Sequence, residues 1–452
     1  MQSENQLEDK LDLSLLIPEN SIASPPTTEP AIKSGIPSTA STTSLSNNAS
    51  SPKFECVQNP SCSLNTQVKS PEKANKEPHL YPLHIKPKKP PPEVIFISPT
   101  RALLDYFEFL TEYEHNEISY YDEIYFVGDE CEKNKGKFDD EDGYYKTVIG
   151  DHLAYRYEVK EFLGCGTFGH VFRCYDYKRH IEVAIKIIRN KILYRTAGDL
   201  ENKILHELAK ADPNDVNCIV KKLRSFEFRN HLCLVFELLS LNLFQFLHKN
   251  NFQGASIQLI RRISVQLFMA LKTVHNVGII HCDLKPDNVL LKYENKSSIK
   301  VIDFGSACQE GHKVYEYIQS RYYRAPEIVI EAGYDKAIDI WSVGCILYEL
   351  LTGNPLFPAN SEHELFRMYV EVMGMPPMGF VMKGKRKQYY VEVSGKLRKP
   401  AQPGIRPIKF LLERFDEKIR DLVDRCIRWA PEDRIDAEEG LQHVWVRGGQ
   451  KS

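Results

Sequence analysis

Two short motifs constrain this 452-residue chain more than any other feature of its sequence. Residues 281–288 read HCDLKPDN, and residues 303–305 read DFG, beginning twenty residues after Asp283. Together they offer two carboxylates, an ammonium group and an amide. Catalysis of phosphoryl transfer consists mainly of positioning and charge neutralisation by such groups. Each motif alone also fits an ordinary strand–loop–strand with charged turn residues, so the surrounding sequence has to decide.

Four further motifs surround these two in a fixed order. They are GCGTFGHV at 164–171, VAIK at 183–186, APE at 325–327 and DIWS at 339–342. The glycine-rich motif lies between two strand-like runs, 157–163 and 171–175, whereas a dinucleotide-binding motif would open a helix. The ordered set matches the protein-kinase signature, and the chain resembles a eukaryotic protein kinase.

Composition excludes several other classes. The formal net charge of −2 argues against a protein that coats nucleic acid, so we expect no nucleic-acid partner. The sequence has no run of 18 apolar residues, which predicts no membrane span, and its first residues lack the features of a secretory signal. The 11 cysteines are odd in number and scattered. This pattern favours reduced thiols and a location in the cytoplasm, the nucleus or both.

The chain is expected to have four regions. Residues 1–93 are rich in Pro, Ser, Thr and Asn and poor in aromatic side chains. They cannot bury enough apolar surface to fold, so we predict a disordered arm. Residues 94–156 are dense in Phe and Tyr, which indicates an accessory segment that packs on a neighbour. Residues 157–446 carry the motifs, and residues 447–452 form a short tail.

The motif-bearing region changes character at about residue 238. Its first part, 157–237, reads as strands with one helix from about Thr196 to Ala211. Its second part, 238–446, has apolar residues at helical spacing, most clearly at 259–275 and 338–351. We therefore predict an α+β fold with a small β-rich N-lobe, which contains one main helix, and a larger α-helical C-lobe. Substrates would bind in the crevice between them.

The kinase signature gives a role to each residue of the upstream motifs. Lys186 would hold the α and β phosphates of ATP, and Glu201, fifteen residues on, would pair with it. A helical Glu is usually a surface charge, but this spacing and the apolar helix face beside it favour the ion pair. Gly164 and Gly166 would let backbone N–H groups approach phosphate, with Cys165 between them as a thiol that we expect to be inert.

The downstream motifs supply the remaining chemistry. Asp283 would accept the proton of the substrate hydroxyl, and Lys285 would meet the transferring phosphate as a point charge. Asn288 and Asp303 would hold Mg²⁺, with Mn²⁺ as an alternative. Oxygen ligands of this kind suit these two ions and do not suit zinc.

One position departs from the signature, because Cys282 replaces the usual Arg before the catalytic Asp. That Arg commonly pairs with a phosphate on the activation segment, so a different anion site is expected. Tyr317 lies four and seven residues before Arg321 and Arg324. A phosphate on Tyr317 would add about −1.5 to −2 charges, which these two side chains could clamp. The alternative is that both arginines only hold backbone carbonyls; we favour the clamp because guanidinium matches phosphate geometry.

Longer strings narrow the resemblance. Residues 315–327 read YEYIQSRYYRAPE and, with HCDLKPDN, resemble the dual-specificity tyrosine-phosphorylation-regulated kinases, the DYRK family of the CMGC group. The acidic run 139–145, which by composition alone would be a solvated loop, is similar to the DH box of that family. Residues 117–128 are similar to the accessory segment of its class II members. The homeodomain-interacting kinases share HCDLKP and SRYYRAPE but lack the YxY and these upstream elements.

The resemblance covers about residues 94–446 and implies an enzyme of dual specificity. The nascent chain would phosphorylate its own Tyr317 in cis. The mature enzyme would phosphorylate Ser and Thr of other proteins, preferring Pro after the target and Arg before it. Ser320 would support Asp283 and Lys285, and both upstream elements would support the N-lobe.

The residues expected to contact ATP, as the resemblance implies, are Leu163, Gly164, Cys165, Gly166, Thr167, Phe168, Gly169, Val171, Ala184, Lys186, Glu201, Phe236, Glu237, Leu238, Leu239 and Leu290. Residues 237–239 would meet the adenine, and Phe236 would narrow the pocket behind them. Two substitutions bear on substrate choice: Gln245 stands where relatives often carry an acidic residue, and Asp287 replaces the usual Glu. Selectivity for Arg is therefore expected to be relaxed.

The sequence disfavours two other functional classes. A non-catalytic scaffold with a kinase fold, recruiting partners through the arm, is disfavoured by four intact positions, Lys186, Asp283, Asn288 and Asp303. A strict tyrosine kinase is disfavoured because Lys285 between Asp283 and Asn288 is the arrangement of Ser/Thr kinases. We expect a monomer that acts on protein substrates.

Cys282 and Cys308 flank the catalytic loop and the DFG motif. If their sulfur atoms lie close together, a reversible disulfide would gate activity. Free alkylation of both thiols after mild peroxide treatment, with activity nevertheless lost, would exclude this hypothesis.

Overall fold

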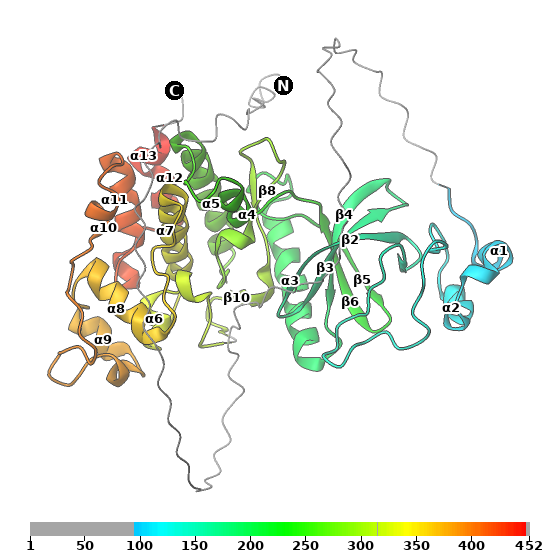
Figure 1. Cartoon of the computed structure of the whole chain (residues 1–452), viewed down its shortest axis with the longest axis horizontal. Helices are drawn as coiled ribbons and strands as arrows, with labels where there is room; N and C mark the ends of the chain where they lie inside the picture. The colour runs from blue at the N-terminus through cyan, green and yellow to red at the C-terminus, as the bar shows by residue number, and fades with distance from the viewer. Residues whose placement is uncertain (1–94, 314, 449–452) are drawn as a thin grey trace, which may run out of the picture. The chain divides into compact units, whose positions relative to one another are not determined.

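The computed structural model describes residues 95–313 and 315–448. The predicted disordered arm, 1–93, and most of the predicted tail lie outside these residues. The described chain divides into an N-terminal unit, residues 95–239 with Phe304–Ser306, and a C-terminal unit made of the remaining residues. The first carries the main β-sheet and the second most of the helices (Figure 1). This confirms the predicted α+β fold with a β-rich N-lobe and a helical C-lobe.

A six-stranded antiparallel sheet with the order β1-β2-β3-β4-β6-β5 is the centre of the N-terminal unit. Its strands are β1 (His152–Leu153), β2 (Tyr157–Gly166), β3 (Gly169–Asp176), β4 (Ile181–Ile188), β5 (Lys222–Phe228) and β6 (His231–Glu237). The predicted runs 157–163 and 171–175 fall within β2 and β3, which both continue into the glycine-rich motif. Val183, Ile185 and Ile187 of β4 belong to one buried cluster, because alternate residues of a strand face the same side of the sheet.

The main helix of this unit, α3 (Ile192–Ala211), begins four residues earlier than predicted. Helical spacing relates its buried residues, which are Ala197, Gly198, Glu201, Ile204, Leu205 and Leu208. The first turn lacks such a stripe, since Ile192 is 89% exposed. Apolar periodicity therefore could not place the start of the helix.

The aromatic accessory segment folds into short helical pieces. They are α1 (Pro99–Asp105), η2 (Phe107–Phe109), α2 (Glu112–Glu117) and η3 (Ile118–Tyr120). Ser98 caps α1 by accepting from the backbone N–H of Arg101, and Thr111 forms a capping box with Glu114 at the start of α2. Side chains of the segment form a small hydrophobic core together with Tyr155, which precedes β2. Packing thus explains the aromatic composition.

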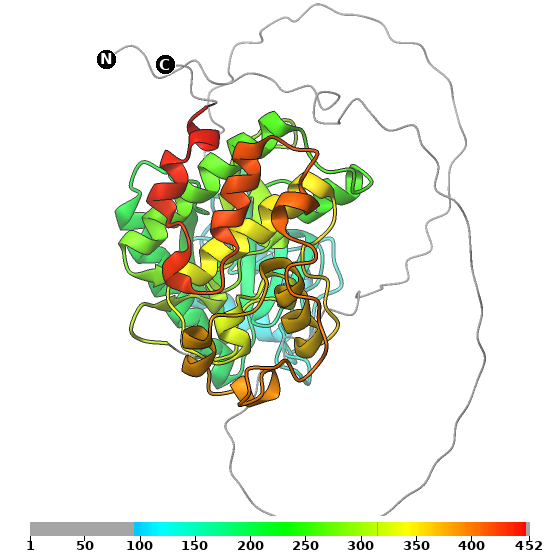
Figure 2. The ribbon, with the colours of Figure 1, turned by 90° about the vertical axis from the view of Figure 1, so that its left-hand side faces the viewer.

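Helices dominate the C-terminal unit. They are α4 (Leu243–Lys249), α5 (Ile257–Asn276), α6 (Pro326–Val329), α7 (Ala337–Thr352), α8 (Glu362–Met373), α9 (Met378–Lys383), η7 (Lys387–Tyr389), α10 (Ile408–Leu411), α11 (Glu417–Cys426), η8 (Pro431–Asp433), α12 (Ala437–Gln442) and α13 (Val444–Arg447). The predicted helical stretches lie in α5 and α7. The whole of α7 from Ile338 to Leu351 is buried, and it contacts both α5 and α11 (Figure 2), so it is the central helix of the unit. None of the helices in the described part of the chain is both long and apolar enough to span a bilayer.

Short elements between α5 and α6 carry the downstream motifs. They are β7 (Ile279–Ile280), η4 (Pro286–Asn288), β8 (Val289–Leu291), β9 (Ile299–Val301), β10 (Cys308–Gln309) and η6 (Arg321–Tyr323), with η5 (Phe304–Ser306) assigned to the N-terminal unit. The strands pair antiparallel, β8 with β9 and β7 with β10. These two ladders hold the catalytic loop beside the start of the DFG motif.

Candidate active site

A buried ion pair joins β4 to α3 in the N-terminal unit. The Nζ atom of Lys186 lies 2.9 Å from both carboxylate oxygens of Glu201. Their exposed fractions are only 9% and 2%. The structure thus brings together the two residues that the sequence spacing paired, and it holds the Lys186 ammonium group in a fixed position.

The glycine-rich motif forms a tight turn between β2 and β3. A Cβ atom on Gly169 would lie 2.1 Å from the carbonyl oxygen of Ile187, so only glycine fits there. A Cβ atom on Gly164 or Gly166 would meet nothing within 4 Å. Packing therefore does not explain these two glycines, and the open space beside them fits a close approach of phosphate to the backbone.

Of the residues expected around the adenine, Phe236 and Glu237 end β6, and Leu238 and Leu239 follow that strand. In the N-terminal unit Ala184 of β4 is paired with Phe236 of β6. The chain after Phe236 is tied to the segment before β5: the backbone N–H of Glu237 donates to the carbonyl of Lys221 (3.1 Å), and the N–H of Lys221 donates to the Glu237 carboxylate (2.9 Å). Leu290 belongs to β8 in the C-terminal unit.

The Asp283 carboxylate is held at both oxygens by groups of the C-terminal unit. Its Oδ1 accepts from the backbone N–H (3.0 Å) and the hydroxyl (2.9 Å) of Ser320. Its Oδ2 accepts from Lys285 Nζ (2.8 Å), which also donates to Ser320 Oγ (3.1 Å). Burial opposes the charge of Lys285, but Asp283 and other nearby carboxylates raise the pKa of Lys285 above its usual value, so it stays protonated. Three of the predicted residues therefore form one polar cluster.

Asp339 fixes the backbone of the catalytic loop, a role that the DIWS motif by itself did not reveal. It is completely buried, and its carboxylate accepts from the backbone N–H groups of His281 (2.9 Å) and Cys282 (3.1 Å). It also lies 2.9 Å from Nε2 of His275. Cys282 has a φ of 67°, which is costly for a residue with a side chain, and these bonds stabilise that conformation. Spacing alone could not pair residues 58 positions apart.

The β8–β9 hairpin places Asn288 close to Asp303. The backbone N–H of Ile302, the neighbour of Asp303, donates to the carbonyl of Asn288 (2.9 Å). The side-chain nitrogen of Asn288 donates to the carbonyl of Asp283 (2.8 Å), so its amide oxygen is the atom available to a cation. An amide oxygen and a carboxylate are hard ligands, and the pair fits a divalent cation such as Mg²⁺ or Mn²⁺.

In the activation segment Arg324 contacts Tyr317 directly. Its guanidinium group donates to the Tyr317 hydroxyl and lies 4.0 Å from the centroid of the ring. It also donates to the backbone carbonyls of Ile318 (3.0 Å) and Gln319 (2.7 Å). Arg324 therefore holds backbone carbonyls, as the alternative expects, and also contacts the hydroxyl that would carry the phosphate. The phosphate clamp itself stays a prediction. Arg321, by contrast, donates to the carbonyl of Asn360 (3.1 Å), whereas the contact with Tyr317 comes from Arg324.

The thiols of Cys282 and Cys308 are neighbours. Their Sγ atoms lie 3.7 Å apart, and both residues are buried. Hydrogen bonds from the Cys282 thiol and, to a smaller extent, the Tyr334 hydroxyl lower the pKa of Cys308. The distance meets the condition set by the disulfide hypothesis, and gating by oxidation stays a prediction. All nine cysteines of the described residues are free thiols.

The structure shows the surroundings of Gln245 and Asp287, the two positions expected to relax the preference for Arg. Gln245 forms a capping box at the start of α4, where its side chain accepts from the backbone N–H of Asn242 (3.1 Å). Burial raises the pKa of Asp287, so its negative charge is less favourable than that of an exposed carboxylate. Both features are compatible with a weaker site for a cationic substrate residue.

Glu349 of α7 should make the stability of the C-terminal unit depend on pH. Burial raises its pKa to about 7 from an ordinary 4.5, and its carboxylate accepts from the Tyr323 hydroxyl (2.7 Å). The folded chain binds this proton more tightly than the unfolded chain, so stability falls as the pH rises from about 4.5 to 7. Glu349→Gln keeps an acceptor for Tyr323. We expect it to raise the free energy of unfolding by about 3 kcal/mol at pH 8 and by less than about 1 kcal/mol at pH 5.

Urea denaturation followed by tryptophan fluorescence measures this effect, because Trp341 lies on the same helix. The exposed Glu417 provides the matched control, since Glu417→Gln should shift stability little at either pH. An equal gain from Glu349→Gln at both pH values would contradict a raised pKa.

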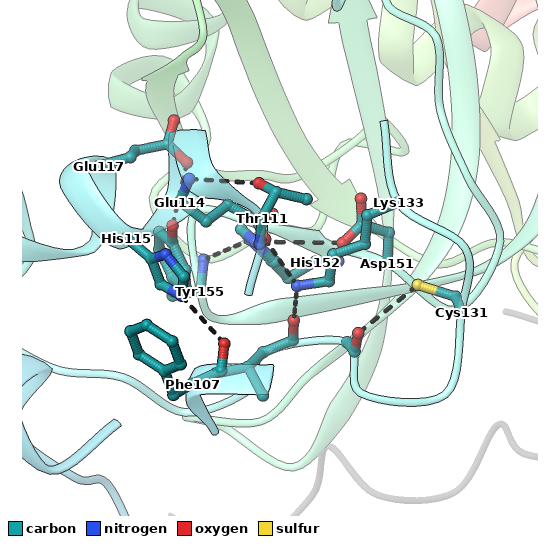
Figure 3. Close-up of polar contacts among 12 residues, drawn as sticks. Phe107, Thr111, Glu114, His115, Glu117, Cys131, Lys133, Asp151, His152 and Tyr155 are labelled. Carbon is teal, nitrogen blue, oxygen red and sulfur yellow. Dashed lines mark hydrogen bonds and ion pairs between the residues drawn. The ribbon is translucent and has the colours of Figure 1, made fainter. Parts of the chain in front are cut away.

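A second group of buried charges surrounds Glu114 of α2 in the N-terminal unit (Figure 3). Its Oε1 lies 2.9 Å from His152 Nε2 and 2.9 Å from Arg229 Nη2, and its Oε2 accepts from Lys133 Nζ (2.9 Å). A backbone N–H donates to Nδ1 of His152, and burial lowers the pKa of that residue, so the imidazole is neutral with its proton on Nε2. Glu114, Asp151 and His152 are close enough to suggest a metal site. Since two side-chain cations already bind the Glu114 carboxylate, we interpret the cluster as an ion-pair network.

Comparison with known proteins agrees with this geometry. Residues 157–446 match the protein kinase domain. The chain is 42% identical over 387 residues to dual specificity tyrosine-phosphorylation-regulated kinase 3 of Homo sapiens, covering 78% of this chain and 66% of that protein. It is 41% identical over 374 residues to dual specificity tyrosine-phosphorylation-regulated kinase 4 of Homo sapiens, covering 79% of this chain and 72% of that protein. A DYRK-family kinase of Schizosaccharomyces pombe is 42% identical over 358 residues (75% and 33%). The chain therefore belongs to the protein kinases and, within them, to the family of dual-specificity tyrosine-phosphorylation-regulated kinases.

Proposed function

We propose that this kinase transfers phosphate from ATP to Ser and Thr of proteins and, once during maturation, to Tyr317 of its own chain. Its kinase domain supports the use of ATP and a divalent cation on protein substrates, and the names of its relatives support dual specificity. The observation that carries the proposal is the cluster of Asp283, Lys285 and Ser320. It holds a proton acceptor and a cation side by side, as transfer to a hydroxyl requires.

Each unit would contribute separately to nucleotide binding. ATP would supply the phosphoryl group, and the cation, which we propose to be Mg²⁺, would neutralise charge on its phosphates. In the N-terminal unit Lys186, fixed by Glu201, would bind phosphate oxygens. In the C-terminal unit Asn288 and Asp303 would hold the cation with their side-chain oxygens.

Asp283 would accept the proton of the substrate hydroxyl. The donors from Ser320 and Lys285 prevent rotation of its carboxylate, so the remaining lone pair, on Oδ2, keeps a fixed direction. Lys285 stays protonated and would stabilise the charge on the transferring group. These groups are in place before any substrate arrives, so little reorganisation is needed.

A phosphate on Tyr317 would meet Arg324 first, since that guanidinium already contacts the hydroxyl. The Glu362 carboxylate lies 3.9 Å from Arg324 and pairs with Arg386 at 2.7 Å. The phosphate carries more charge than a carboxylate, so we expect Arg324 to bind the phosphate and Glu362 to remain with Arg386. Arg321 would complete the clamp by leaving the carbonyl of Asn360.

Mass spectrometry of the recombinant protein tests the two-stage activity. We expect phosphate on Tyr317 of almost every wild-type molecule and none on the Asp303→Asn variant, because that variant loses a ligand of the cation. With Mg·ATP and a peptide library, product should appear on Ser and Thr only. An active preparation without phosphotyrosine would refute the clamp, and equal phosphate incorporation by Asp303→Asn would favour a non-catalytic scaffold.

We also propose a preference for Pro after the target residue, with weakened selectivity for Arg because of Gln245 and Asp287. The free thiols support a reducing location, in the cytoplasm, the nucleus or both. The nearly neutral net charge supports the absence of a nucleic-acid partner, and we propose that the chain acts as a monomer. Peptide arrays that vary the residue after the target would test the first of these proposals.

A further inference from the structure

The acidic run 139–145 contacts the glycine-rich turn, although the two are separated in sequence. The Tyr144 hydroxyl donates a long hydrogen bond (3.4 Å) to the carbonyl of Gly166. The Tyr144 ring also stacks on His170 of β3, with centroids 4.1 Å apart and planes 9° from parallel. Tyr144 therefore touches both sides of the turn.

Arg189, which follows β4, completes this contact. Its guanidinium lies between two aromatic rings, 4.3 Å from the centroid of Tyr144 and 4.1 Å from that of Tyr194. It donates to the carbonyl of Thr167 (3.4 Å), and its backbone N–H donates to the carbonyl of Phe168 (3.0 Å). Three consecutive carbonyls at the tip of the turn, those of residues 166–168, thus accept bonds from Tyr144 and Arg189. We call these two residues the brace.

The brace is itself anchored to the sheet. Arg189 donates twice to the carbonyl of Asp142 (2.6 and 3.0 Å), and the N–H of Asn190 donates to the carbonyl of Gly143 (2.7 Å). His231 of β6 lies 2.9 Å from the Asp139 carboxylate. Arg189 is only 9% exposed. The acidic run is therefore held at several points, so Tyr144 within it has a fixed position and can fix the conformation of the glycine-rich turn.

Peptide geometry gives the brace a consequence for nucleotide binding. The chain has no cis peptide bond among the described residues, and in a trans peptide plane the N–H points opposite to the C=O. When the carbonyls of Gly166 and Thr167 face the brace, the N–H groups of Thr167 and Phe168 face away from it. Those N–H groups belong to the turn that we assign to phosphate binding.

We propose that Tyr144 and Arg189 are positioning residues for the phosphates of ATP. They act by orienting the backbone N–H groups of the glycine-rich turn, and this inference rests on the proposed function. The acidic run, in this view, supports more than the stability of the sheet: it sets the affinity for the triphosphate part of the nucleotide. The adenosine part, whose adenine we assign to residues 236–239, should not depend on the brace.

Binding measurements on the full chain test this division. Tyr144→Phe removes one hydrogen bond and keeps the ring, so it should raise KM and Kd for Mg·ATP about threefold; Tyr144→Ala removes both and should raise them about tenfold. The Kd for adenosine and the value of kcat should change less than about twofold, because the contacts of the brace given above include none of the residues assigned to the adenine or to the substrate hydroxyl. The control is Tyr120→Ala, at an accessory-segment tyrosine that is 86% exposed, and it should change none of these values.

Two results would overturn the inference. Unchanged Mg·ATP affinity in Tyr144→Ala would show that the brace does not position the phosphates. An equal loss of affinity for Mg·ATP and adenosine would show that the brace only supports the structure of the N-terminal unit. Tyr144→Phe keeps the packing, so it decides the question should Tyr144→Ala fold poorly. Failure of the proposed function is distinguishable, because the wild-type chain would then not bind Mg·ATP.

Discussion

Asp283→Asn should lower kcat by about three orders of magnitude, the range found when a general base is removed. The amide cannot take the proton of the substrate hydroxyl. Its NH₂ group would also face either Ser320 or Lys285, which both donate to the carboxylate, so the held orientation would be lost. Steady-state transfer from Mg·ATP to a Ser-containing peptide measures the effect. The KM for ATP should change little, since the role proposed for Asp283 is to accept the proton of the substrate hydroxyl and not to bind the nucleotide.

Two variants bracket this expectation. Ser320→Ala removes one hydrogen bond to Oδ1 but leaves the backbone N–H, so kcat should fall only about tenfold. Asp122→Asn makes the same chemical change at an exposed position of the accessory segment and should leave kcat unaltered. If Asp283→Asn kept more than about a tenth of wild-type kcat, another group would have to be the proton acceptor.

Arg229→Met should destabilise the N-terminal unit by about 3 kcal/mol, because removing one partner of a buried ion pair leaves an uncompensated charge. The Arg229 side chain is 1% exposed and donates to both Glu114 and Glu117 of α2. The remaining cation beside Glu114 is Lys133, so the expected loss lies at the lower end of the usual range. The variant should therefore loosen the accessory segment from the turn between β5 and β6.

Amide hydrogen exchange of β5 and β6 is the suitable measurement. The three tryptophans, Trp341, Trp429 and Trp445, all belong to the C-terminal unit, so their fluorescence would not report on the N-terminal unit. Arg195→Met is the matched control: its pair with Glu227 joins side chains that are 38% and 52% exposed, and its loss should cost less than about 1 kcal/mol. Equal effects of the two substitutions would show that burial of the Glu114 cluster adds nothing to stability.

Local pattern was sufficient for much of the fold. Alternation identified the strands on either side of the glycine-rich motif, and helical spacing identified α5 and α7, because each pattern repeats within one element. Apolar spacing puts the start of α3 four residues too late, because the first turn of the helix is exposed. The accessory segment was recognised by its aromatic content, but its capped helices and its separate core with Tyr155 depend on contacts that no periodicity records.

The sequence by itself determined the chemistry: which side chains can accept a proton, bind phosphate or hold a cation, and in what order along the chain they stand. Short motifs suffice for this because those residue types are needed at fixed local spacing. The family resemblance predicts Ser320 beside Asp283, and spacing predicts Arg324 beside Tyr317. Only the tertiary structure decided which further distant groups orient the site: Asp339 on the backbone of the catalytic loop, and Tyr144 with Arg189 on the glycine-rich turn. Such partners are chosen by packing across many residues, and a linear pattern carries no record of packing.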